Sequence, residues 1–196
     1  MRTKATAVID AWVGISIAAF LIGLVDRSWV LRWGGLVPER VWHGELWRLV
    51  TWQFVELGPI SALGRWYVVR HFGARLATSC DARALVRYLV AISLAAAIPA
   101  TLLAALLGRG DEAHLSGMAI SNAILIAWTL RCPGDVFVVV IAPMIRLRGI
   151  AMIAVVLATV LFGVAVQGPF GMSLELFGFA AALLYPTSGS SRPSAA

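Results

Sequence analysis

The chain has 196 residues, of which 60% are hydrophobic and 13% charged, and its mean hydropathy is +0.87. A soluble domain carries about 25% charged residues, so the composition excludes an ordinary soluble enzyme and favours one domain in a lipid bilayer. The net charge of +6 comes from arginines that lie mostly between apolar runs. Such arginines anchor spans at a membrane, and we therefore expect no nucleic-acid partner.

A transmembrane helix needs about 20 apolar residues, and the range extends down to about 17. The candidate spans, in chain order, are 7–25, 59–76, 88–107, 115–130, 149–167 and 170–185. The second is the weakest because it contains Arg65, Arg70, His71 and Arg75. The expected fold is all-α: a polytopic six-transmembrane-helix bundle over residues 1–185. A Ser- and Pro-rich disordered tail is predicted for 186–196.

Two stretches between the spans are unusual. Residues 26–53 hold five of the eight tryptophans, interleaved with arginine, glycine and proline. An indole ring is stable at headgroup depth, so we place these tryptophans in the membrane interface as anchors. The apolar stretch 136–145 is too short to span, and Pro143 interrupts it. It is predicted to be a membrane-dipping connection or the lower end of the next helix.

The distribution of charge predicts a topology. With six spans and the N-terminus inside, eleven of the 16 basic residues lie on the cytoplasmic side, and the positive-inside rule then places both termini in the cytoplasm. Fifteen of the basic residues are arginine and only Lys4 is lysine. That bias is typical of a GC-rich bacterial genome, which points to a bacterial inner (plasma) membrane.

Glu175 and Arg65 are charged residues inside the predicted spans that need an explanation. A charge at membrane depth costs about 2.5–3.5 kcal/mol on insertion scales and needs a partner or a wet cavity. Glu175 lies about a turn and a half inside the last span, and Arg65 is its most obvious countercharge. Gly171 and Gly178 are seven residues apart on the same helix, where small side chains allow close packing.

The segment 44–54, Gly-Glu-Leu-Trp-Arg-Leu-Val-Thr-Trp-Gln-Phe, resembles the rhomboid superfamily, which includes derlins and rhombosortases. That family carries a Trp-Arg motif, often followed by Thr, in a membrane-embedded loop between its first two helices. Trp47, Arg48 and Thr51 match this motif. The stretches 72–76, 115–117 and 176–179 resemble the end of the family's second helix, the start of its fourth helix and its Gly-rich sixth helix. The resemblance therefore implies a rhomboid-like bundle across nearly the whole chain.

The same resemblance implies where a serine protease site would lie. Ser116 falls on the family's nucleophile and Gly117 on the residue after it, whereas Glu175 falls on the histidine of the catalytic dyad. Arg65 falls on the asparagine that lines the oxyanion hole, and His114 on the first glycine of the nucleophile motif. A carboxylate is a poor general base toward a serine hydroxyl. These replacements therefore imply that the catalytic machinery is lost.

Three hypotheses follow. The first is a catalytically inactive pseudoprotease that binds transmembrane helices of other proteins or a larger membrane complex. The second is an active intramembrane serine protease that uses Ser116. The third is a transport or proton-handling protein built on Glu175, Arg65 and Glu56. We expect no cofactor and no metal, because Cys80 and Cys132 lack metal-type spacing.

Overall fold

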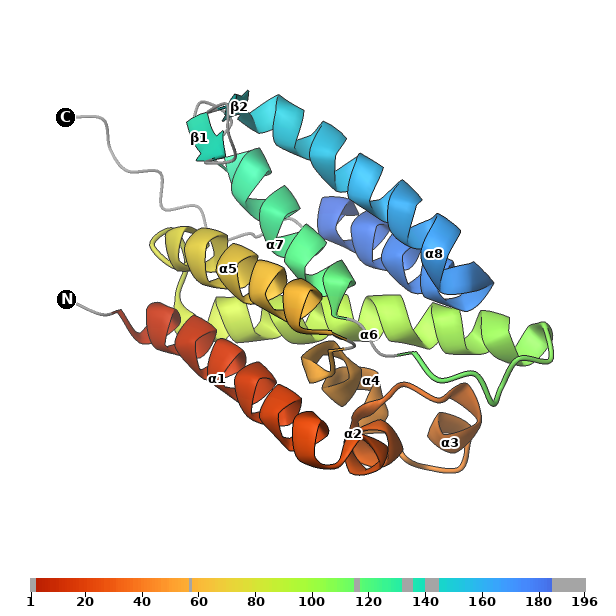
Figure 1. Ribbon diagram of the computed structural model, residues 1–196. Coiled ribbons are helices and arrows are strands. Elements are labelled where there is room, and N and C mark those ends of the chain that lie inside the picture. The colour runs from red at the N-terminus through yellow and green to blue at the C-terminus, as the bar shows by residue number, and fades with distance from the viewer. Residues whose placement is uncertain (1–2, 57, 115–116, 132–135, 140–144, 185–196) are drawn as a thin grey trace.

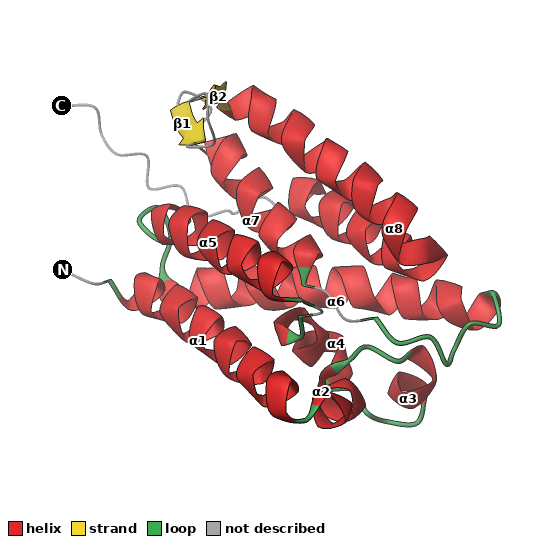
Figure 2. Ribbon diagram, in the orientation of Figure 1, coloured by secondary structure: helices red, strands yellow, loops and turns green. Residues whose placement is uncertain are grey.

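The computed structural model describes residues 3–56, 58–114, 117–131, 136–139 and 145–184 (Figure 1). This part of the chain is mostly helical, as Figure 2 shows. The elements are α1 (Lys4–Val25), α2 (Arg27–Gly34), α3 (Pro38–Trp42), α4 (Arg48–Thr51), η1 (Trp52–Phe54), α5 (Pro59–Leu76), α6 (Ala82–Leu106), α7 (Met118–Arg131), β1 (Val136–Val139), β2 (Ile145–Arg148) and α8 (Gly149–Leu184). The predicted tail 186–196 lies outside the described residues.

Helix α8 consists of two limbs joined by a sharp turn. The backbone leaves the helical region at Gly168, whose φ of 74° is in the left-handed region that favours glycine. In Figure 1 the two limbs fold back beside each other. The turn separates the two spans predicted at 149–167 and 170–185.

A large apolar core joins α1, α5, α6, α7 and the second limb of α8. Its largest fully buried members include Ile9, Phe72, Tyr88 and Trp128. The rings of Phe72 and Trp128 meet edge to face, with centroids 4.8 Å apart. Close side-chain packing of this kind drives helix association in a membrane, where the hydrophobic effect between helices is weak.

Helices α1 and α5 lie antiparallel. The Arg70 Nε is 2.9 Å from the Asp10 Oδ1, and the Trp66 Nε1 donates to the Ser16 Oγ at 3.1 Å. Asp10, near the start of α1, is thus half of an interhelical ion pair. This pair explains how α5 accommodates Arg70 despite its weak hydropathy.

The segment between α1 and α5 folds into α2, α3, α4 and η1. It packs against a face of small residues on α6, where Ala96, Ala97 and Ala100 are buried with Trp52 and Leu36. Four of the five tryptophans predicted as interfacial anchors are about half exposed, namely Trp29, Trp33, Trp42 and Trp47. Trp52 is 0% exposed, so its assignment as an anchor was wrong. Its ring belongs to the core.

The strands β1 and β2 form an antiparallel pair, with Val136 opposite Arg148 and Val139 opposite Ile145. The sequence predicted a membrane-dipping connection or the lower end of the next helix at 136–145. Val136–Val139 is a strand, so the helix end was wrong there, and the membrane-dipping connection stays a prediction. The residues Val136–Val139 have high β-propensity. Pairing with β2 gives hydrogen-bond partners to their backbone N–H and C=O groups.

Candidate functional site

The guanidinium of Arg65 is the centre of a buried polar network. Its Nε lies 2.6 Å from the Glu56 Oε1, and both side chains are 2% exposed. Nη1 donates to the backbone carbonyl of Gln53, and Nη2 donates to the Ser16 Oγ at 2.7 Å. The guanidinium carbon also lies 5.1 Å from the centroid of the Trp12 ring. Arg65 therefore ties α1, η1 and α5 together.

Gly117, just before α7, closes this network from the opposite side. A Cβ added there would collide with the Arg65 Nη1 and the Gln53 carbonyl oxygen, so only glycine fits. The Glu56 carboxylate adjoins the backbone amide of Gly117. The first amides of a helix have no partner within the helix, and a nearby carboxylate stabilises that end of the helix dipole. The Arg65–Glu56 pair thus anchors the start of α7.

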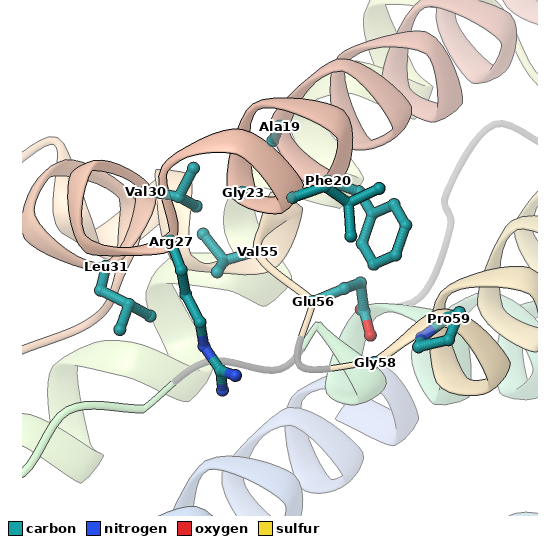
Figure 3. A pocket seen from close by; sticks show the side chains of 11 residues that line it. Ala19, Phe20, Gly23, Arg27, Val30, Leu31, Val55, Glu56, Gly58 and Pro59 are labelled. Atoms are coloured by element: carbon teal, nitrogen blue, oxygen red, sulfur yellow. The ribbon is translucent and has the colours of Figure 1, made fainter.

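A pocket of about 100 Å³ opens next to this network between α1, α2 and the start of α5. Figure 3 shows Phe20 and Gly23 of α1 on one side, Val55 and Glu56 on the other, and Arg27 at the edge. Its walls are largely apolar. The carboxylate of Glu56 is the acidic group that lines it.

Glu175, in the second limb of α8, is 2% exposed. Its Oε2 accepts a hydrogen bond of 3.2 Å from the Asn122 Nδ2 of α7, and the backbone amide of Ala119 adjoins the same carboxylate. Within the described part of the chain, Oε1 has no hydrogen-bond partner. Glu175 therefore fastens the last helix to the first turns of α7.

The sequence suggested Arg65 as the countercharge of Glu175, and this was wrong. Arg65 pairs with Glu56. The chain is extended at Gly58, with φ −157° and ψ 161°, before it enters α5, and Glu56 lies beside Arg65 at the second turn. Spacing along the chain could not reveal this pairing, since it depends on the path of the backbone before the helix.

Ser116, the residue at the nucleophile position, lies outside the described residues, as does Leu115. His114 is described and buried. Its backbone pairs with Leu36 in both directions, at 2.8 and 3.0 Å, and its ring packs between Trp52 and Phe170. These contacts fix the His114 backbone against Leu36 and its ring against Trp52 and Phe170.

The segment carrying Trp47, Arg48 and Thr51 is organised by Arg48, which is fully buried. The Arg48 Nε lies 2.5 Å from the Glu45 Oε2, and Nη1 donates to the Gly35 carbonyl at 2.5 Å. Nη2 donates to the Arg32 carbonyl. These carbonyls end α2, and a guanidinium satisfies the free acceptors of a helix C-terminus. Arg48 therefore caps α2.

Thr51 adds a hydrogen bond from its Oγ1 to the Gly34 carbonyl at 3.3 Å, whereas Trp47 is about half exposed.

The glycines predicted for close packing lie on α8. Gly171 is buried. At Gly178 an added Cβ would lie 2.9 Å from the Ala119 Cβ and 3.5 Å from the Ala96 Cβ. Gly178 therefore sits where α6, α7 and α8 cross.

Sequence reasoning missed three polar residues of the site: Ser16, Gln53 and Asn122. Each is buried, and each shares a hydrogen bond with Arg65 or Glu175. The available signal was a polar side chain inside an apolar run. Asn122, for example, is the only amide side chain in α7.

The surface of the bundle is unusually apolar, with Val25 91% and Ile60 86% exposed. Among the described residues, α1 and α6 are each long and apolar enough to cross a membrane, and Met118–Arg131 and Phe170–Leu184 are shorter apolar helices. A soluble monomer rarely exposes so much contiguous apolar surface. Together with the buried ion pair of Arg65 and Glu56, these features are typical of an integral membrane protein.

The chain belongs to the family described as eukaryotic integral membrane protein (DUF1751), which it matches over residues 8–187. No curated protein matches the chain. Because the family is eukaryotic, our assignment to bacteria and to a bacterial inner membrane was wrong. The arginine-rich composition on which it rested does not identify the membrane that holds the protein.

Proposed function

We propose that this protein is a rhomboid-like membrane protein that binds transmembrane helices of partner proteins and does not cleave them. Six helical crossings are inferred, formed by α1, α5, α6, α7 and the two limbs of α8. The proposal rests on one observation, which concerns the two positions where this chain lacks the catalytic asparagine and histidine of the rhomboid family. Arg65 and Glu175 are each buried and engaged in contacts that hold helices together.

The contacts of Arg65 argue against an oxyanion hole. Such a hole needs donors aimed at the place where negative charge develops. In the described structure, Arg65 directs its three nitrogens at the Glu56 carboxylate, the Gln53 carbonyl and the Ser16 hydroxyl. Freeing a donor would break a buried ion pair, which costs about 3–5 kcal/mol.

The chemistry of Glu175, a carboxylate where the family has an imidazole, argues against a dyad base. A general base must be able to take a proton from the nucleophile within about 3 Å. Glu175 shares Oε2 with Asn122, and its carboxylate adjoins the start of α7. A carboxylate held in this way supports the packing of α7 against α8. It supplies no imidazole to Ser116.

The test is reconstitution of the full chain in vesicles with single-span transmembrane peptides that carry a fluorophore. Energy transfer to dye-labelled protein measures association, and gel analysis measures cleavage. We expect association of a subset of peptides and equal, background cleavage by wild type and Ser116→Ala. Cleavage lost in Ser116→Ala overturns the proposal, and so does the absence of association with every peptide.

One observation favours a second candidate function, proton handling. A buried carboxylate with one oxygen free of hydrogen bonds, as Glu175 has among the described residues, marks proton pathways in membrane proteins. Proton flux into vesicles, measured with a pH-sensitive dye, tests this candidate. Flux above the protein-free background that is abolished by Glu175→Gln supports it, whereas flux equal to background excludes it.

A further inference from the structure

A groove of about 520 Å³ runs along the outer face of the bundle between α1 and α5. This volume is within the range of about 300–1,000 Å³ that is usual for small-molecule sites. Its lining consists of Val13 from α1 and, from α5, Leu63, Trp66, Tyr67, Arg70, His71 and Ala74. The groove is separate from the pocket that Glu56 lines.

The two ends of the groove differ in polarity. Leu63, which is largely exposed, makes one end apolar, and Val13 lies between the levels of Arg70 and Trp66. The other end holds Arg70, Tyr67 and His71. The Arg70 side chain is 45% exposed, and its contact with Asp10 is made through Nε. The described residues provide no hydrogen bond to its two Nη atoms, which leaves them available to a ligand.

The polar end also carries an excess of positive charge. Because α1 and α5 are antiparallel, the start of α1 and the end of α5 lie together, as Figure 1 shows. These ends bring the exposed residues Lys4 and Arg75 to the same side as Arg70. Asp10 is the acidic group of the two helices at this end. Basic residues gathered at one membrane face attract anionic headgroups.

Arg70 lies six residues before the end of α5 at Leu76, or about 9 Å at 1.5 Å per residue. Its Nε is paired with Asp10, and the rest of the half-exposed guanidinium can reach from that depth toward the headgroups. A phosphate carries the opposite charge, and two of its oxygens can accept both parallel N–H groups of the planar guanidinium. A transmembrane helix offers mostly apolar side chains to the same nitrogens.

We propose that the groove between α1 and α5 binds an anionic glycerophospholipid. Its phosphate lies on the Arg70 guanidinium beside Tyr67 and His71, and one acyl chain follows Val13, Leu63 and Trp66. The site does not depend on the proposed partner-binding function.

The experiment is native mass spectrometry of the full chain in a non-ionic detergent. The probes are dioleoylphosphatidylglycerol, dioleoylphosphatidylcholine and inorganic phosphate. The variant is Arg70→Gln, and the matched control is Arg83→Gln, which removes an equal charge from an exposed position on α6. We expect phosphatidylglycerol to bind best and Arg70→Gln to weaken it about tenfold, as for the loss of one charge-assisted contact. Arg83→Gln is expected to bind like wild type.

Arg70→Gln also removes the ion pair of Asp10, so a second variant is needed. Ala74→Phe fills the groove without changing any charge, and we expect it to weaken lipid binding as well. Equal loss in Arg83→Gln, equal binding of the two lipids, inorganic phosphate binding as tightly as the lipid, or full binding by Ala74→Phe would each overturn the proposal. If Arg70→Gln does not fold, the Ala74→Phe result decides.

Discussion

Two buried arginines, Arg48 and Arg65, stabilise non-helical backbone in this protein. Each directs its guanidinium at one carboxylate and at backbone carbonyls that lack a partner in a helix. A guanidinium has five N–H donors in a fixed plane, so one side chain satisfies several acceptors at once. In a bilayer, where water cannot reach such carbonyls, this allows irregular segments to fold at depth.

The ion pair between Arg65 and Glu56 is predicted to be strongly coupled. Either Arg65→Leu or Glu56→Leu alone leaves a buried charge unpaired and is expected to cost about 3–5 kcal/mol of unfolding free energy. The double variant should recover much of that loss, because no isolated charge remains. The free energy of unfolding of wild type, the two single variants and the double variant is measured in a graded series of a denaturing detergent.

The control for this cycle is the exposed pair of Arg109 and Glu112, whose atoms are 3.2 Å apart. Replacing Arg109 by leucine is expected to cost less than about 1 kcal/mol, as exposed pairs usually do. If the losses of unfolding free energy in Arg65→Leu and Glu56→Leu simply add in the double variant, the pair is not the link between α1, η1 and α5.

Substitution of Arg48 by lysine tests the capping role at α2. A lysine ammonium keeps the charge but cannot reach Glu45 and the carbonyls of Arg32 and Gly35 together. We expect a loss on the order of 3 kcal/mol, since bonds to charged groups contribute about 1.5–3 kcal/mol each. Arg40→Lys is the matched control, because exposed Arg40 makes one long bond of 3.4 Å. Thermal unfolding in detergent that gave equal stabilities for the two variants would contradict the capping role.

At the level of elements, the bundle depends on small residues where helices cross. The alanines of α6 allow Trp52 and Leu36 to approach on one side, and Gly178 allows α8 to approach Ala119 on another. Small residues let backbones approach closely in membranes and so increase van der Waals packing. These crossings bring Glu175 to the start of α7.

Gly178→Leu is therefore predicted to destabilise the bundle by about 3 kcal/mol, the upper part of the usual cost of overpacking. Gly14→Leu is the control, since an added Cβ at Gly14 meets nothing within 4 Å. The control is expected to unfold like wild type or later, because leucine is a better helix former than glycine. Similar losses in both variants would mean that the crossing at Gly178 is looser than described.

Sequence reasoning predicted the long helices well, because apolar runs of fixed length have few other folds in lipid. The segment Pro59–Leu76 was predicted with the observed bounds although hydropathy gave it little support. The strand pair and the burial of Trp52 were missed. Both depend on contacts with elements distant in the chain, which a local pattern does not encode.

The candidate site was only partly predictable. Arg65 and Glu175 were singled out as charges inside predicted spans and then, with Gly117, through resemblance to a family; the structure describes all three as buried. Their partners Glu56 and Asn122 were not assigned, because pairing between buried charges follows from how the backbone turns at Gly58 and how α7 packs on α8. The role of Ser116 remains a proposal drawn from its position in the sequence.

For the whole molecule, membership in an integral membrane protein family agrees with the exposed apolar surface and the buried ion pairs. The polar groups inside the bundle link helices to one another. That arrangement is suited to a protein that holds partners in the bilayer. It is less suited to one that must present a nucleophile, a base and an oxyanion hole to water.

The central claim, that Ser116 is not an activated nucleophile, is tested most directly by labelling with a fluorophosphonate probe. The protein is kept in native membranes, and wild type is compared with Ser116→Ala at equal expression. An established serine hydrolase in the same membranes verifies that the probe is active. We predict that both forms of the chain show the same background signal. Labelling of wild type that disappears in Ser116→Ala would contradict the account.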